Sequence, residues 1–199
     1  LYVFFLEVAK IKSLKSKKGI KLIDKQLLKS KTLVNEVQEL GRSSDEIANF
    51  LNKYKNIFVL GPGPYSALAY QASNIFKETA KIHTEGFEVA EFRHGPLEMV
   101  SSEVLLILIN CGISSVKNQL FSIPNLSQST GASSVLVNIS NDDKYDDSTT
   151  YSIKLPFMDN DILGSIISLP LFHEWAYKLA KLRDLNPNTF ENIKKTWVD

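Results

Sequence analysis

The part of this sequence best suited to chemistry is the stretch 77–99, which holds two of the three histidines and five glutamates within 23 residues. Carboxylates and imidazoles are the side chains that most readily take and return protons near neutral pH. The stretch follows an apolar strand pattern, a glycine turn and a helix pattern. Because open α/β sheets place their active sites beyond the carboxyl ends of the strands, we expect residues 77–99 to lie in that crevice.

The stretch contains the corner His94-Gly95-Pro96. A residue before proline is biased toward extended geometry, and proline is well tolerated in the first turn of a helix. This pattern predicts that His94 sits at a fixed junction between a loop and a helix.

The spacing of these residues resembles the SIS (sugar isomerase) family, and most closely the second SIS domain in the isomerase half of glucosamine-6-phosphate synthase. The matching positions are Phe76-Lys77-Glu78, residues 82–87 and residues 91–96. The resemblance implies a phosphosugar isomerase that interconverts an aldose and a ketose, or that aminates or deaminates a hexose 6-phosphate. No cofactor is implied.

The resemblance also implies roles for two residues. Isomerisation moves a proton between adjacent carbons, so it needs a carboxylate that takes and returns it. Glu78 is our candidate, because partial burial at the last turn of a packed helix would make it a stronger base. His94 is our candidate for opening the sugar ring. Alternatively, Glu78 is a solvated residue that pairs with Lys81.

The neighbouring polar residues of the stretch favour structural roles. His83 is expected to orient the structure through a hydrogen bond. Glu85 and Glu91 are expected to be partners of Arg93 or of the loop backbone.

Composition limits the class of protein. The formal net charge is +1, with 44% hydrophobic and 23% charged residues, which is ordinary for a globular domain and gives no basic field for nucleic acid. The single cysteine, Cys111, leaves no disulfide framework and no Cys-based metal site, and it indicates a reducing, cytoplasmic setting. The apolar runs 104–109 and 162–171 are shorter than the roughly 20 residues that cross a bilayer, so no membrane partner is expected.

Hydrophobic periodicity predicts an α/β fold: a three-layer αβα arrangement with a doubly wound parallel sheet, flavodoxin-like and preceded by helices. The expected strands are 56–60, 104–110, 133–139 and 151–155. The expected helices are 1–12, 22–40, 46–53 behind a Ser44-Asp45 cap, 65–79, 115–129 and 159–183. The last helix is so apolar that we expect burial on two sides, against the sheet and against another subunit or domain, with His173 packed inside or at an interface.

The domain organisation is what the resemblance to the SIS family implies. Residues 1–18 are expected to be a helix and link from a preceding domain, although an ordinary N-terminal helix is the alternative. Residues 19–55 are lead-in helices, and 56–199 form the SIS core and tail. Because the chain begins within a helical pattern, we expect it to be the C-terminal portion of a longer protein. The aspartates of 141–149 favour a solvated loop over a calcium site.

The glycine turn 61–64 is a weak candidate for phosphate binding. It resembles a phosphate cradle, but Pro62 and Pro64 lack the N–H donors that a cradle uses. Ser66, at the start of the following helix, remains as a possible substrate contact.

The tail 184–199 resembles the family's C-terminal motif at Asn186, Pro187 and Asn192. This alignment places the family's catalytic lysine on Lys195, whereas counting back from the chain end gives Lys194. A lysine near an open-chain carbonyl can polarise it or assist ring opening.

Two functions therefore stay open. The matches at Glu78, His94 and Lys195 favour the enzyme. Ile75 stands where the family usually has lysine, and Phe190-Glu191 replaces Pro-Arg; these losses of cationic side chains favour a binding or regulatory module.

Family members build the active site between two SIS domains and across a dimer. The resemblance thus implies a phosphorylated sugar as ligand, and a preceding SIS domain or second subunit, in a homodimer, as partner.

Overall fold

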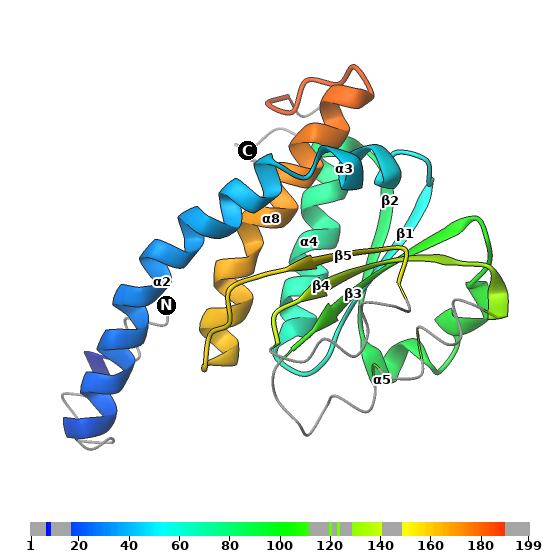
Figure 1. The fold of residues 1–199 in the computed structure, drawn as a ribbon. Helices are drawn as coiled ribbons and strands as arrows, with labels where there is room; N and C mark the ends of the chain where they lie inside the picture. The colour runs from blue at the N-terminus through cyan, green and yellow to red at the C-terminus, as the bar shows by residue number, and fades with distance from the viewer. Residues whose placement is uncertain are drawn as a thin grey trace, which may run out of the picture.

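The computed structural model describes residues 7–8, 17–111, 120, 123, 129–140 and 149–189. A parallel five-stranded sheet in the order β2-β1-β3-β4-β5 forms its centre (Figure 1). The strands are β1 (Asn56–Gly61), β2 (His83–Glu88), β3 (Val104–Asn110), β4 (Ser133–Asn138) and β5 (Tyr151–Lys154). The helices are α2 (Lys17–Arg42), α3 (Asp45–Leu51), α4 (Tyr65–Ala80), α5 (Val89–Phe92), the 3-10 turn η1 (Pro96–Met99) and α8 (Asp161–Leu182).

The central strands carry the hydrophobic core. Every residue of β3 is buried, as are all but the first of β1 and of β4, as expected of parallel strands covered on both faces. Phe76 of α4 and Trp175 of α8 pack in the cluster on one face of the sheet, while Phe92 of α5 belongs to the cluster on the other face. The predicted three-layer α/β fold is therefore confirmed.

The strand β2 was missed in the sequence prediction, which expected four strands. It is an edge strand of six residues in which only Thr84 is buried, so it lacks the continuous apolar run of the inner strands. Gly86 lets α4 approach this strand closely, because a Cβ there would lie 2.5 Å from the carbonyl oxygen of Ala69.

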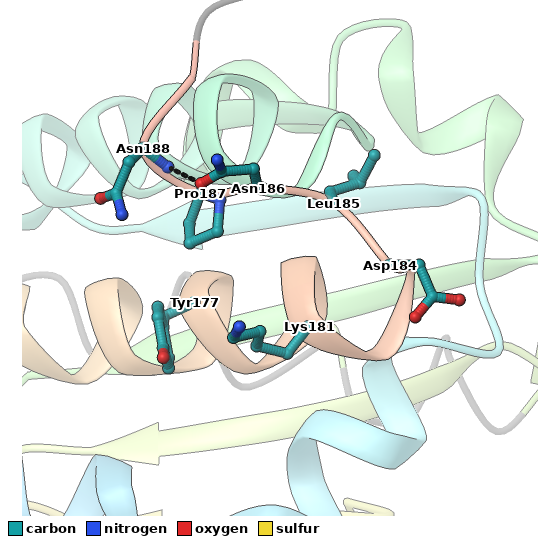
Figure 2. Close-up of a pocket in the computed structure, with 7 residues that line it drawn as sticks. All are labelled: Tyr177, Lys181, Asp184, Leu185, Asn186, Pro187 and Asn188. Atoms are coloured by element: carbon teal, nitrogen blue, oxygen red, sulfur yellow. Dashed lines mark hydrogen bonds between the residues drawn. The ribbon is translucent and has the colours of Figure 1, made fainter.

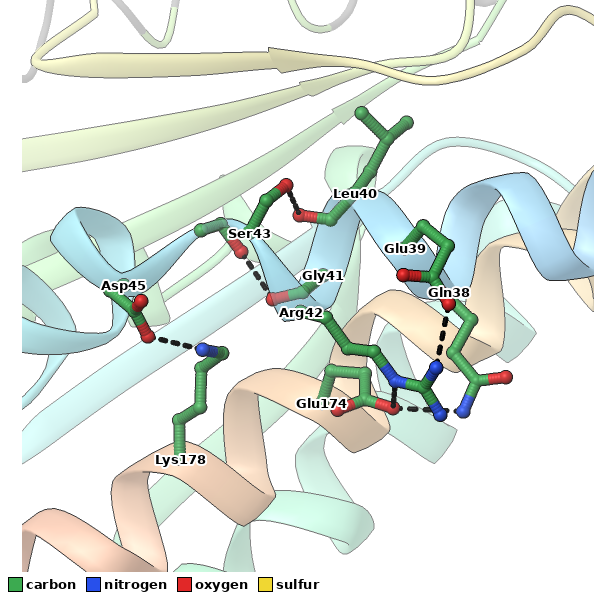
Figure 3. Close-up of polar contacts among 10 residues, drawn as sticks. Gln38, Glu39, Leu40, Gly41, Arg42, Ser43, Asp45, Glu174 and Lys178 are labelled. Atoms are coloured by element: carbon green, nitrogen blue, oxygen red, sulfur yellow. Dashed lines mark hydrogen bonds and ion pairs between the residues drawn. The ribbon is translucent and has the colours of Figure 1, made fainter.

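The lead-in helices α2 and α3 are held against α8 by polar contacts (Figure 3). Glu174 of α8 accepts a hydrogen bond from Gln38 Nε2 at 2.8 Å and pairs with Arg42 Nε at 3.4 Å. Lys178, one turn further along, pairs with Asp45 at the start of α3. These contacts place the junction between α2 and α3 beside the C-terminal half of α8.

Ser44 is at the N-cap position of α3 as predicted, but its hydroxyl makes no capping hydrogen bond. It donates instead to the Gly41 carbonyl at 2.8 Å and accepts from Trp175 Nε1 at 2.7 Å. The residue thus joins α3 to α8 rather than capping α3 through its side chain.

Within the chain, α8 packs against both α2 and α4. Its expected burial against another subunit or domain stays a prediction. His173 is exposed, so its predicted place in the interior is wrong. Its alternative place at an interface stays a prediction. Most of the expected helix 1–12, most of the helix 115–129 and most of the loop 141–149 lie outside the described residues.

Candidate functional site

Glu78 lies near the C-terminal end of α4, and its side chain is exposed. The partial burial expected for it is therefore wrong for this chain. The helix ends at Ala80, and Lys81 follows in the left-handed conformation with φ 52°. Lys81 Nζ folds back and donates to the Glu78 carbonyl oxygen at 2.7 Å. Since α4 begins after the carboxyl end of β1 and ends before the amino end of β2, Glu78 lies at the amino edge of the sheet.

His94 follows α5 directly, because its backbone N–H donates to the Glu91 carbonyl at 3.0 Å. Pro96 begins the turn η1, so the predicted loop-to-helix corner is confirmed. Gly95 is not extended as expected; it adopts φ 136°, a backbone conformation that favours glycine. The His94 side chain is exposed.

The two acid/base candidates thus lie on either side of β2. Glu78 precedes the strand and His94 follows both the strand and α5. A strand of six residues spans about 20 Å. From the sequence, both residues were expected beyond the carboxyl ends of the strands. This expectation is correct for His94 and wrong for Glu78. Within one chain, Glu78 therefore lies at the amino edge of the sheet and His94 at the carboxyl edge.

The other polar residues of the motif are engaged locally. His83 Nδ1 lies 3.1 Å from Asn56 Oδ1, and its Nε2 lies 3.4 Å from Glu85 Oε1. The predicted structural hydrogen bond of His83 is confirmed. Glu85 thus pairs with His83, and Glu91 Oε2 accepts from the Tyr70 hydroxyl at 3.2 Å.

The glycine turn between β1 and α4 is closely packed, and the amides that follow it are already engaged by the backbone. A Cβ on Gly61 would lie 2.2 Å from the Tyr65 carbonyl oxygen. The Tyr65 and Ser66 amides donate to the Pro62 and Gly63 carbonyls at 3.1 and 3.0 Å. The sequence argument against a phosphate cradle here is therefore supported, and Ser66 sits half-buried in the first turn of α4.

The start of the tail returns to the helix end that carries Glu78. Lys81 Nζ, which contacts the Glu78 carbonyl, also donates to the Thr189 carbonyl at 3.4 Å. Asn186 shapes this segment, since its Oδ1 accepts from the Asn188 amide at 3.0 Å. Lys194 and Lys195 lie outside the described residues, so their side chains are not placed.

Between the tail and α8 lies a pocket of about 470 Å³ (Figure 2). It is lined by Tyr177, Lys181, Asp184, Leu185, Asn186, Pro187 and Asn188. Glu78, His94 and Ser66 do not line it. A second hollow of about 340 Å³, between α4 and β2, is lined by Lys77 and His83 among others. Sequence reasoning did not point to either hollow.

The carboxyl edge of the sheet holds a buried polar network that the sequence prediction missed. Asn110 Nδ2 at the end of β3 donates to Asn138 Oδ1 at 3.1 Å and to Ser140 Oγ at 2.9 Å. Polar residues ending two apolar strand runs were the signal that could have revealed it. Nearby, burial raises the pKa of the Tyr65 hydroxyl well above its ordinary value, helped by the charges of Asp161 and Cys111.

The described residues contain no group of three His, Cys, Asp or Glu side chains that could hold a metal ion. None of the described helices is long and apolar enough to cross a membrane.

Fold and site together define an open, parallel α/β domain whose candidate acid/base residues flank an edge strand. The sequence profile of the SIS domain matches residues 50–180, and the chain belongs to this family.

Curated relatives agree with this assignment. Glutamine–fructose-6-phosphate aminotransferase (isomerizing) from Thermococcus kodakarensis is 24% identical over 198 residues, which cover 98% of this chain and 32% of that protein. The Caulobacter vibrioides enzyme of the same name is 34% identical over 85 residues, 43% of this chain and 14% of that protein. The chain thus spans about a third or less of the length of these relatives.

Solved structures share the fold. The C-terminal domain of glucosamine-fructose-6-phosphate aminotransferase from Francisella tularensis superposes with a TM-score of 0.84 at 19% identity, covering 94% of this chain and 52% of that one. Tagatose-6-phosphate ketose/aldose isomerase from Escherichia coli gives a TM-score of 0.62 at 18% identity, covering 73% of this chain and 41% of that one.

Proposed function

We propose that this chain is the second SIS domain of a cytoplasmic phosphosugar isomerase of the glucosamine-6-phosphate synthase type, acting on a hexose 6-phosphate. The observation that carries the proposal is the contact of Lys81 with both the Glu78 and the Thr189 carbonyls. It holds the start of the tail at the helix end that bears the proposed base. Lys195 lies six residues beyond Thr189, a distance that an extended chain covers within about 20 Å.

In this proposal Glu78 removes a proton from C1 of the open-chain ketose and returns it to C2. Lys195 polarises the C2 carbonyl oxygen, with Lys194 and Ser66 as further substrate contacts. The exposure of Glu78 suits this role because the base must meet a ligand bound outside the domain. Covering the site with a second SIS domain or subunit would remove water and strengthen the base.

His94 opens the sugar ring by proton exchange between the anomeric hydroxyl and the ring oxygen. Because β2 separates Glu78 from His94 in one chain, the imidazole at a given site comes from the other copy of a homodimer. The opposite placement of the two residues supports this arrangement. The relatives suggest that this chain is part of a longer protein. The activity is assigned to that whole protein.

The test is turnover of fructose 6-phosphate by the full-length protein and by its Glu78→Gln variant. We expect the variant to lose at least about a hundredfold in kcat, because a general base contributes roughly that much or more. Glu46→Gln is the matched control, since Glu46 is an exposed glutamate on α3, and it should keep wild-type turnover. Binding of the sugar without turnover by the wild type would instead identify a binding or regulatory module, and unchanged turnover in Glu78→Gln would contradict the assigned base.

A further inference from the structure

The carboxylate of Glu88 joins three backbone segments around the carboxyl end of β2. Its Oε2 accepts from the amides of Ala90 at 2.6 Å and Glu91 at 3.4 Å, so it caps the N-terminus of α5. Its Oε1 lies 3.4 Å from the Gly63 amide, which donates to it from the glycine turn after β1. One side chain thus ties α5 to a turn 25 residues away in the sequence.

The rest of α5 is also fixed. Val89 and Phe92 are fully buried, and the Phe92 ring packs edge-on against Phe58 at 5.7 Å. On the outer side, the Tyr70 hydroxyl donates to Glu91 at 3.2 Å. A helix of only four residues has little stability of its own, so these contacts from β1, α4 and Glu88 must hold it.

His94 begins where α5 ends, with its amide bonded to the Glu91 carbonyl. Its side chain is exposed, and Gly95 beyond it has the backbone freedom of glycine. The position of the imidazole is therefore determined mainly by α5 and the residues that hold α5.

We propose that Glu88 is a positioning residue for His94: by capping α5 and tying it to the β1–α4 turn, it holds the imidazole where the sugar ring must be opened. This inference rests on the proposed function of His94. Glu88 touches no substrate in this scheme and acts through α5 alone.

Three variants of the full-length protein separate its contacts. Glu88→Ala removes both the cap and the tie to Gly63. Glu88→Asp keeps a carboxylate that can cap α5, because aspartate is a favoured N-cap residue, but is one methylene too short to reach Gly63. Glu103→Ala is the matched control: Glu103 is exposed, and its side chain makes no hydrogen bond or ion pair found among the described residues.

The first measurement, amide hydrogen exchange of residues 89–94, does not depend on activity. In Glu88→Ala these amides should exchange roughly fivefold faster than in the wild type, an effect of the size expected for a lost N-cap. Glu88→Asp should show most of the wild-type protection, and Glu103→Ala all of it. Wild-type exchange in Glu88→Ala would overturn the proposal.

The second measurement compares two substrates. The 5-deoxy analogue of fructose 6-phosphate cannot close a ring, because it lacks the 5-hydroxyl and its 6-oxygen is phosphorylated. Glu88→Ala should lose about tenfold or more in kcat on fructose 6-phosphate, within the range typical of a displaced acid/base group, and little on the analogue. Glu78→Gln should be impaired on both.

Equal loss on the two substrates would overturn the positioning role and leave Glu88 a structural residue. A wild-type protein that converts neither substrate would contradict the proposed function itself. In that case the exchange result alone decides whether Glu88 holds the His94 segment.

Discussion

Tyr65 is a fully enclosed phenol at the carboxyl edge of the sheet, with 1% of its surface exposed. Burial, followed by the charges of Asp161 and Cys111, raises the pKa of its hydroxyl above the ordinary value of 10.0. Burial disfavours the charged form of the phenol, so the folded chain keeps Tyr65 protonated at pH values at which the unfolded chain releases the proton.

This difference predicts an alkaline loss of stability that depends on Tyr65. Below pH 10 both states are protonated and the hydroxyl adds no pH dependence. Above it the unfolded state is favoured by up to about 1.4 kcal/mol for each pH unit. Tyr65→Phe should therefore show a flatter fall in the free energy of unfolding than wild type in urea titrations between about pH 8 and 11. Parallel curves for the two proteins would contradict the assignment.

The Tyr65 hydroxyl also limits the size of the side chain that fits at Gly164 of α8. A Cβ on Gly164 would lie 2.3 Å from Tyr65 Oη but 3.3 Å from Cζ. Gly164→Ala should thus destabilise the wild type by about 1–3 kcal/mol through overpacking, although alanine is the better helix former. In the Tyr65→Phe background the cost should fall sharply, because the closest atom is gone. Denaturant unfolding of the four proteins of this double-mutant cycle measures the coupling, and additive effects would refute the contact.

At the scale of elements, the strands β1, β3 and β4 were predictable because inner parallel strands read as continuous apolar runs. The strand β2 was not, because an edge strand carries polar side chains such as His83 and Glu85. Overlooking β2 also hid the geometry of the site. With that strand in place, Glu78 must lie at the amino edge, where α4 ends, and His94 must lie beyond the carboxyl end of β2.

The side-chain roles were predicted less well than the elements. An exposed Glu78 and an exposed His173 lie on helices whose apolar spacing was read correctly, yet spacing shows which face is buried only when the packing partners are known. The signal for Glu88 was a carboxylate directly before a short helical run, which is the position of an N-cap. Its tie to Gly63 depends on the pairing of β1 with β2, which the sequence alone did not reveal.

The junction of α3 and α8 depends on the hydrogen bond between Trp175 and Ser44. Trp175 is fully buried, so Ser44→Ala would leave its indole N–H without an acceptor. We expect a loss of about 1–3 kcal/mol in the free energy of unfolding, the usual cost of a buried unsatisfied donor. Ser43→Ala is the control, because Ser43 is exposed and donates only to the Leu40 carbonyl in the described contacts, and it should change stability by less than about 0.5 kcal/mol. Equal effects of the two substitutions would show that the Trp175 contact contributes nothing.

At the scale of the whole molecule, the proposed function implies that one chain presents two incomplete half-sites. Glu78 and the start of the tail lie at the amino edge of the sheet. His94 lies beyond the carboxyl end of β2. A two-fold symmetric dimer uses the same surface on both copies, so each half-site of one copy can meet the complementary half-site of the other.

Mixing two inactive variants of the full-length protein tests this arrangement. Glu78→Gln and His94→Ala should each abolish turnover of fructose 6-phosphate as homodimers. After subunit exchange at equal amounts, half of the dimers are mixed, and each mixed dimer contains one site with both substitutions and one with neither. Activity should therefore recover to about a quarter of the wild-type value, as two-fold symmetry requires. Mixing two batches of the same variant is the control, which should remain inactive. If both residues of a site came from the same copy, mixing would restore nothing, because every site would still carry a substitution.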